Sequence, residues 1–172
     1  MNVSLLTPTT DLQEEYLDFY NEWKDSDETM IPWVISKNPA NFPAMVQELL
    51  DAHNGINIPE TWVPDSTYWL VTDENKIAGA VNIRHSLTEH LFNAGGHIGY
   101  GIRPSERRKG YATKLLALSL EKTKELNITK VLVVCDAVNT AFEKTILHNG
   151  GIRDDDFTEE DGNIVRRYWI EL

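Results

Sequence analysis

The sequence predicts an α/β (α+β) fold in which a mixed sheet carries helices on both faces. Some segments repeat apolar residues at three- and four-residue spacing and others at alternate positions, so helices and strands share the chain. The segments follow the order helices, hairpin, strand–helix, strand–helix and closing strands, which favours helices packed on a sheet. The hydrophobic share of 41% and charged share of 25% are ordinary for a soluble globular protein.

Two helices are expected before the first strands. Residues 11–28 place apolar side chains at helical spacing, and Thr10 or Asp11 can cap the start. Residues 29–43 contain prolines and asparagines that indicate a loop. A second helix is expected from about Asn41 or Phe42 to His53, where Asn54-Gly55 ends it.

A β-hairpin is expected next. Residues 67–72 and 77–84 are apolar-rich segments separated by a turn-like Asp-Glu-Asn-Lys sequence. Gly79 in the second strand indicates a bulge or a close backbone approach. Residues 87–96 are expected to form a polar link that ends in glycine.

The segment from His97 to Leu116 changes its apolar period from two to about four. Ile98, Tyr100 and Ile102 alternate with glycines, which predicts a strand, and Pro104 ends it. Apolar residues at four-residue spacing then predict a long helix from residue 111 to about residues 126–127.

A basic turn closed by glycine separates this strand from this helix. The first turn of a helix has backbone N–H groups without partners, and Gly110 lets a ligand approach them. Arg107, Arg108 and Lys109 add positive charge at the same place. A phosphate or diphosphate uses all of these features. The alternative is a solvated basic turn at an ordinary strand–helix junction.

The last third of the chain is expected to add a strand, a helix and closing strands. Residues 131–135 form a continuous apolar run that predicts an interior strand, and 140–149 a helix ended by glycines. Residues 154–156 and 159–161 are aspartate and glutamate and are expected to form a mobile acidic connection before a final strand at 164–172. Cys135, the only cysteine, is expected to be a core residue rather than a nucleophile, and a cytoplasmic location is the default.

Charge and motif content disfavour several classes of function. The net charge is −11, so nucleic-acid binding is disfavoured, whereas cationic small molecules or basic peptides are compatible partners. No apolar run approaches the ~20 residues of a membrane helix. The five histidines form no pair at i, i+4 spacing and there is no Cys-x-x-Cys motif, so no metal site is expected.

The motif Arg107-x-x-Gly110-x-Ala112 resembles the Arg/Gln-x-x-Gly-x-Gly/Ala signature of the GCN5-related N-acetyltransferase (GNAT) superfamily. The preceding strand, the following helix, a second apolar strand and an asparagine after it come in the family's order over roughly residues 94–151. The resemblance implies a largely antiparallel central sheet whose two central strands splay apart. It implies one acetyltransferase domain over 1–172, with acceptor-side helices and loops at 1–66, a cofactor-binding core at 67–151 and closing strands at 152–172.

The resemblance also implies a reaction and a cofactor. Members transfer an acetyl group from acetyl-coenzyme A (acetyl-CoA) to an amine, directly within a ternary complex and without a metal. The acceptor is a small molecule or a peptide or protein amine. Carried over to this sequence, the cofactor-binding residues are Ile102, Arg103, Arg107, Arg108, Lys109, Gly110, Tyr111, Ala112, Thr113 and Asn139.

The catalytic residues are less closely tied to the family pattern. Many members place a glutamate base on the strand before the signature, where this chain offers His97, whose ordinary pKa suits it to accept a proton near neutrality. The alternative is a structural histidine between strands. Where many members have a tyrosine acid this chain has Ile146, so Tyr100 and Tyr168 are the candidates, or water serves. The departure leaves open an alternative function, a catalytically weak acyl-CoA-binding regulatory or sensor module.

Aromatic side chains of the first 66 residues have two interpretations. In the family, the variable N-terminal helices form part of the wall of the acceptor site, so the resemblance implies that these aromatic side chains line a pocket. The alternative is that they pack on the sheet as core or lid residues. They are Tyr16, Tyr20, Trp23, Trp33 and Trp62.

Overall fold

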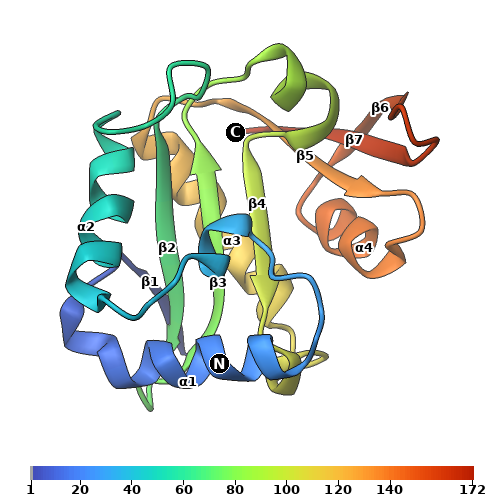
Figure 1. Cartoon of the computed structure of the whole chain (residues 1–172). Helices are drawn as coiled ribbons and strands as arrows, with labels where there is room; N and C mark the ends of the chain where they lie inside the picture. The colour runs from blue at the N-terminus through green and yellow to red at the C-terminus, as the bar shows by residue number, and fades with distance from the viewer. Residues whose placement is uncertain (1) are drawn as a thin grey trace.

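The computed structural model describes residues 2–172 and contains two antiparallel sheets that lie side by side (Figure 1). The larger sheet has the order β1 (Val3–Leu6), β2 (Asp65–Thr72), β3 (Ile77–Arg84) and β4 (Ile98–Ile102). The smaller has the order β5 (Lys130–Asp136), β7 (Ile164–Glu171) and β6 (Ile152–Thr158).

Helices cover both faces of the larger sheet, as the sequence predicts. Helices α1 (Gln13–Asp25) and α2 (Phe42–His53) pack on one face, and α3 (Tyr111–Glu125) packs on the other (Figure 1). Helix α4 (Thr140–His148) lies beside α3 and β5. The mixed α/β fold class is therefore confirmed.

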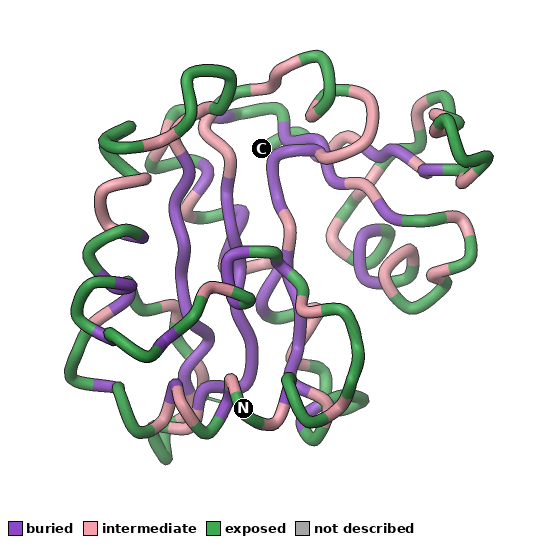
Figure 2. Tube along the Cα trace, viewed as in Figure 1, coloured by how far each residue is buried: buried purple, intermediate pink, exposed green. Residues whose placement is uncertain are grey.

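The alternation of β2 divides the buried side chains between two cores. Tyr68 and Leu70 face the core under α3, whereas Trp69 and Val71 face the core under α1 and α2. Figure 2 shows that β2, β3 and β4 are buried along most of their length. Period-two alternation with both faces apolar is the pattern of a sheet covered on both sides.

Gly79 has both properties expected of it. The pairing of β2 with β3 shifts by one residue between Leu70 and Val71, opposite Ala78, which is a β-bulge. A Cβ atom on Gly79 would lie 2.7 Å from the carbonyl oxygen of Gly101 on β4. The two strands therefore approach more closely here than a side chain would allow.

The two sheets meet through one residue of the segment before β4. The backbone N–H of His97 donates to the carbonyl of Leu132 (2.8 Å), and the N–H of Leu132 donates to the His97 Nδ1 (2.9 Å). Beyond this contact β4 pairs only with β3, so in the part of the chain described here the edge of β4 toward β5 carries no ladder hydrogen bonds. The central strands splay apart from this point.

The acidic segment at 154–161 belongs to a β-hairpin and is not a mobile connection. Residues 152–158 form β6, which pairs with β7 in a hairpin whose turn contains Asp161 and Gly162. Asp154 accepts hydrogen bonds from the Trp169 Nε1 (2.8 Å) and the Arg167 Nη1 (3.1 Å). The partners of the Asp154 carboxylate are on β7, 13 and 15 residues further along the chain. The acidic composition of the segment therefore did not by itself predict a strand.

Three smaller differences concern element limits. Residues 91–95 form a short π-helical turn inside the expected polar link. Helix α1 ends at Asp25, so Glu28 lies in the following loop rather than in the helix. Strand β5 is covered on both faces as expected, but it is the edge strand of its sheet. Among residues 2–172, no helix is both long enough and apolar enough to cross a membrane.

Candidate functional site

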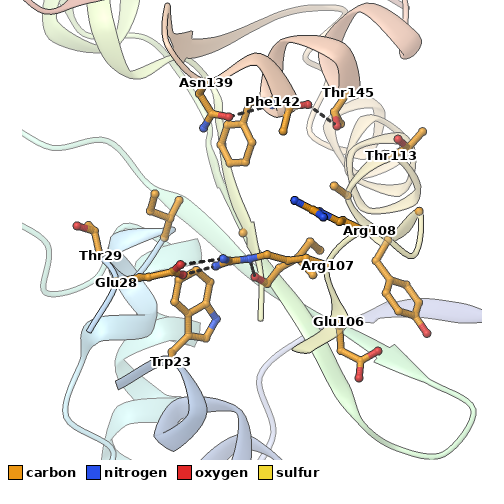
Figure 3. Close-up of a pocket in the computed structure, with 17 residues that line it drawn as sticks. Trp23, Glu28, Thr29, Glu106, Arg107, Arg108, Thr113, Asn139, Phe142 and Thr145 are labelled. Atoms are coloured by element: carbon orange, nitrogen blue, oxygen red, sulfur yellow. Dashed lines mark hydrogen bonds and ion pairs between the residues drawn. The ribbon is translucent and has the colours of Figure 1, made fainter. Parts of the chain in front are cut away.

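A cavity of about 670 Å³ opens where the sheets separate. The end of β4, the basic turn, the start of α3 and helix α4 surround it, and the loop after α1 closes one side (Figure 3). The predicted residues that line it are Ile102, Arg107, Arg108, Gly110, Tyr111, Ala112, Thr113 and Asn139.

The turn before α3 has a backbone that exposes its amides. Pro104–Glu106 form a 3-10 turn, Arg108 has a φ of 62° and Gly110 a φ of 83°. Gly110 is the N-cap of α3, and in the described part of the chain no side chain accepts a hydrogen bond from the first amides of the helix. These N–H groups have no intrahelical partners, so the positive end of the helix dipole is open toward the cavity.

Of the three adjacent cations, only Arg108 has no carboxylate partner within residues 2–172. Arg107 forms a bidentate pair with Glu28 (3.1 and 2.6 Å), and its guanidinium lies 5.1 Å from the Trp23 ring (Figure 3). Lys109 donates to Glu106 (3.1 Å), which Lys76 also contacts. Arg108 has no carboxylate within 4.0 Å in residues 2–172, and its side chain extends toward α4 in Figure 3.

Asn139 holds the opposite wall in place. Its side-chain oxygen accepts a hydrogen bond from the Phe142 N–H (3.1 Å) and so caps α4. Asn139 lines the cavity, and its side-chain amide nitrogen has no hydrogen bond to another group of residues 2–172. Asn139 therefore has a donor left for a ligand.

Tyr100 does not border the cavity. Its ring is 1% exposed and stacks on Phe142 at 4.6 Å between ring centroids. Burial raises the pKa of its hydroxyl above the ordinary value. The hydroxyl is sealed from solvent, and the structure gives it no geometry for donating a proton to a ligand in the cavity.

His97 is also away from the cavity lining. Its side chain is buried and its Nδ1 accepts the Leu132 N–H that joins the sheets. Burial, with the Arg84 charge, lowers the pKa of His97 to about 4. An imidazole with this pKa is a poor base near neutrality, so the geometry favours the structural interpretation of His97.

Arg103 corrects the expectation of a cofactor contact. Its guanidinium is 3% exposed, and it points to the α1 side of the sheet, where it donates to Asp18 (2.9 Å) and Glu22 (3.1 Å). It also donates to the Ile77 carbonyl (3.2 Å). Alternation along β4 places Arg103 on the face opposite Ile102, so it anchors α1 to the sheet instead of lining the cavity.

Several lining residues were not predicted from the sequence. Glu28 and Thr29 come from the loop after α1, and Phe142 and Thr145 come from one face of α4. The three-residue spacing of Phe142 and Thr145 was a usable signal, because residues three apart on a helix lie on the same face. Asn139 caps this helix, so the same face could have been expected near it. Nothing local in the sequence indicates that Glu28 meets Arg107, since 79 residues separate them.

Comparison with known proteins gives one family match. The model for the acetyltransferase (GNAT) domain matches residues 5–152. No curated protein sequence matches significantly.

Three solved structures illustrate the similarity of the fold. The microcin C7 self-immunity acetyltransferase MccE, in complex with acetyl-CoA and AMP, is 16% identical, with a TM-score of 0.68 over 99% of this chain and 92% of that one. An acetyltransferase from Salmonella typhimurium that modifies the N-terminal serine of ribosomal protein L7/L12 is 14% identical, with a TM-score of 0.70 over 100% and 96%. The spermidine/spermine N-acetyltransferase SpeG from Vibrio cholerae, in mutant form, is 15% identical, with a TM-score of 0.66 over 98% and 93%.

Proposed function

The chain belongs to the GNAT family of acetyltransferases, which use acetyl-CoA, and we propose that it is an N-acetyltransferase that acetylates an amine by direct transfer in a ternary complex. The observation that carries this proposal is the open N-terminus of α3 beside the unpaired Arg108, at the mouth of a cavity that reaches the splayed strands. The family alone does not identify the acceptor.

The cavity fits the diphosphate end of acetyl-CoA. Uncapped amides at residues 111–113 and the absence of a Cβ on Gly110 provide an anion site. Arg108 supplies a positive charge that no carboxylate neutralises within the described chain. Among the three cations of the turn, we assign the main phosphate contact to Arg108, because Arg107 and Lys109 are already paired.

The pantetheine arm fits the edge of β4. A strand edge without a neighbour offers N–H and C=O groups to an extended ligand. Gly101 and Ile102 line the cavity from this edge, and Asn139 faces them with its unused amide donor. We propose that these groups hold the arm so that the acetyl end lies in the gap between β4 and α4.

When bound, acetyl-CoA supplies the acetyl group as a thioester. In the transfer the acceptor nitrogen forms a bond to the acetyl carbon, the carbon–sulfur bond breaks, and the proton that the amine loses balances the one that the thiolate gains. We propose that this chain acts mainly by positioning, which is worth about 7–11 kcal/mol for well-oriented reactants. Neither His97 nor Tyr100 has supporting geometry for proton transfer. A thiol has a pKa of about 8.5, so its thiolate is a good leaving group and takes its proton from water.

A sensor that binds acyl-CoA without turnover is the second candidate. The side of α4 that lines the cavity presents Ala141, Phe142 and Thr145, with no tyrosine, and Ile146 is fully buried. This arrangement offers no strong acid to the leaving thiolate.

Calorimetric titration with acetyl-CoA, followed by a thiol-release assay over a panel of amines, tests the proposal. We expect binding, with release that depends on one class of amine. Binding without release on any amine would favour the sensor, and no binding would contradict the phosphate site at α3.

A further inference from the structure

A second cavity, of about 730 Å³, lies on the α1 and α2 side of the larger sheet. Its polar floor comes from the ends of β2 and β3, where Asp65, Asn82 and Arg84 lie on one face. Its apolar walls include Trp33, Trp62, Val63 and Leu91. The two tryptophan rings meet edge to face at 5.1 Å.

The guanidinium of Arg84 is a charge in this cavity that no carboxylate of the described residues pairs with. It has no carboxylate within 4.0 Å in residues 2–172, and its one hydrogen bond there is from Nη1 to the Gly95 carbonyl (3.3 Å). Its other nitrogens are not sealed, unlike the unbonded Arg103 Nε and Arg167 Nη2. Burial lowers the pKa of Arg84, with the Asp65 charge acting in the opposite sense. Most of the donors of this partly buried cation thus remain available.

The acidic group of the cavity floor is already occupied. The side-chain oxygen of Asp65 accepts a hydrogen bond from the Asn82 Nδ2 at 2.6 Å, and its residue is 6% exposed. Asp65 therefore has less to offer a ligand than Arg84 has. Glu89 is the other carboxylate that lines the cavity, and it is exposed to solvent.

Gly99 allows Arg84 to reach across β4. A Cβ atom on Gly99 would lie 3.1 Å from the Arg84 Nη1 and 3.2 Å from its Nη2. The cation therefore rests on β4 two residues from Gly101, which lines the first cavity and is covered on this face by the Ile31 carbonyl. Two residues of strand span about 7 Å.

The loop between α1 and α2 also passes both cavities. Ile31 lines the first and Trp33 lines the second, and in Figure 1 this segment crosses β4 and β3. One loop therefore borders both cavities, on the α1 and α2 side of the sheet.

We propose that the second cavity binds the acceptor, and that this acceptor is an amino acid, an amine that carries a carboxylate and an apolar side chain. Arg84 binds the carboxylate, and Trp33 and Trp62 cover the apolar side chain. The proposal rests on the N-acetyltransferase function. A buried guanidinium suits a carboxylate because it forms two parallel charge-assisted hydrogen bonds.

Matched substrate pairs test the acceptor class. Thiol release is measured for phenylalanine against phenethylamine, tryptophan against tryptamine, and leucine against 3-methylbutylamine, with spermidine as a cationic comparison. We expect kcat/KM to be at least tenfold higher for the amino acid of the best pair. Higher rates with the decarboxylated amines, with spermidine or with an amidated peptide would overturn the inference while leaving the N-acetyltransferase function intact.

Two variants test the role of Arg84. Arg84→Met removes the charge and is expected to abolish the preference for the carboxylate, so that the paired amine becomes the better substrate. Gly99→Ala keeps the charge but crowds the guanidinium, and is expected to raise KM for the amino acid with little change in kcat. Acetyl-CoA affinity, measured by calorimetry, should be unchanged in both and shows that they are folded. An unchanged preference in both variants would exclude Arg84 as the carboxylate site, and acetyl-CoA binding without release on any substrate would instead contradict the proposed function.

Discussion

Gly110 is the residue on which the proposed phosphate site most directly depends. Its φ of 83° is in the left-handed region, and as the N-cap it directly precedes the first amides of α3. We expect Gly110→Ala to weaken acetyl-CoA binding by tenfold or more, because about 1.4 kcal/mol is enough for that change. Calorimetry with the folded variant measures it.

A matched control separates the site from backbone strain. Gly150 has a similar φ of 87°, and a Cβ there would meet nothing within 4 Å. Gly150→Ala carries the same left-handed strain, about 1–2 kcal/mol, without touching the cavity. Equal losses of acetyl-CoA affinity in both variants would contradict the assignment of Gly110.

His97 is expected to affect stability more than chemistry. His97→Ala leaves the buried Leu132 N–H without its acceptor, which costs about 1–3 kcal/mol. We expect a lower free energy of unfolding in urea, with kcat per folded molecule within a few-fold of the natural enzyme. A large fall in kcat with unchanged stability would restore His97 as the base.

At the level of elements, Asn139 has two functions that can be separated. Its oxygen caps α4, and its nitrogen is proposed to contact the pantetheine arm. Asn139→Asp keeps the capping oxygen and loses the donor, so we expect near-normal stability and weaker acetyl-CoA binding. Asn139→Ala is expected to lose both, with about 1 kcal/mol less stability. Urea denaturation and calorimetry on the two variants measure these effects, and normal binding by Asn139→Asp would contradict the contact.

The loop after α1 is tied to the signature turn through Glu28 and Arg107. The paired Arg107 guanidinium lowers the pKa of Glu28, so this carboxylate is charged when the anionic cofactor binds beside it. We expect Glu28→Gln to tighten acetyl-CoA binding by about two- to fivefold, because it removes a negative charge and frees Arg107.

The effect of Glu28→Gln should decrease at high salt, since the pair is exposed. Lys37→Met, which removes the pair of Lys37 with Glu48 and changes no residue of the first cavity, is the control. Weaker binding by Glu28→Gln would mean that the pair positions the loop for the cofactor instead of competing with it.

At the level of the whole molecule, acid should weaken the junctions between layers. Burial, with the Arg84 charge, lowers the pKa of His97 to about 4, and Glu22 has a pKa of about 2 because hydrogen bonds from Arg103 and Ser105 outweigh its desolvation. Both folded values are below the ordinary ones. The stability from His97 is complete above pH 6.5 and is lost as the pH falls toward 4, and that from Glu22 is lost between about 4.5 and 2.

Urea denaturation between pH 7.5 and 4 checks this expectation. We expect the free energy of unfolding to fall steadily below pH 6.5, with a smaller fall in His97→Ala. A flat profile over this range would contradict the buried neutral state of His97.

The sequence by itself determined most of the elements, though neither β1 nor β6, and it located the basic turn that we propose binds phosphate. Apolar periodicity marks strand, turn and helix around Gly110, and the glycine and basic residues there are local signals that need no distant partner. Asn127, with a φ of 60°, ends α3 as its residue type predicts. The GNAT signature is likewise contiguous in the sequence.

Only the tertiary structure decided which charges remain available. Arg103 and Arg107 resemble Arg108 in the sequence, yet the first two meet carboxylates from α1 and the loop after it, 79 to 85 residues away. The role of His97 was likewise left open, because its partner is on β5. The acidic strand β6 was misjudged, because its partner strand is β7. The local sequence pattern indicates which backbone conformation a segment prefers. Charge pairing, burial and pKa instead depend on neighbouring residues that only folding brings together.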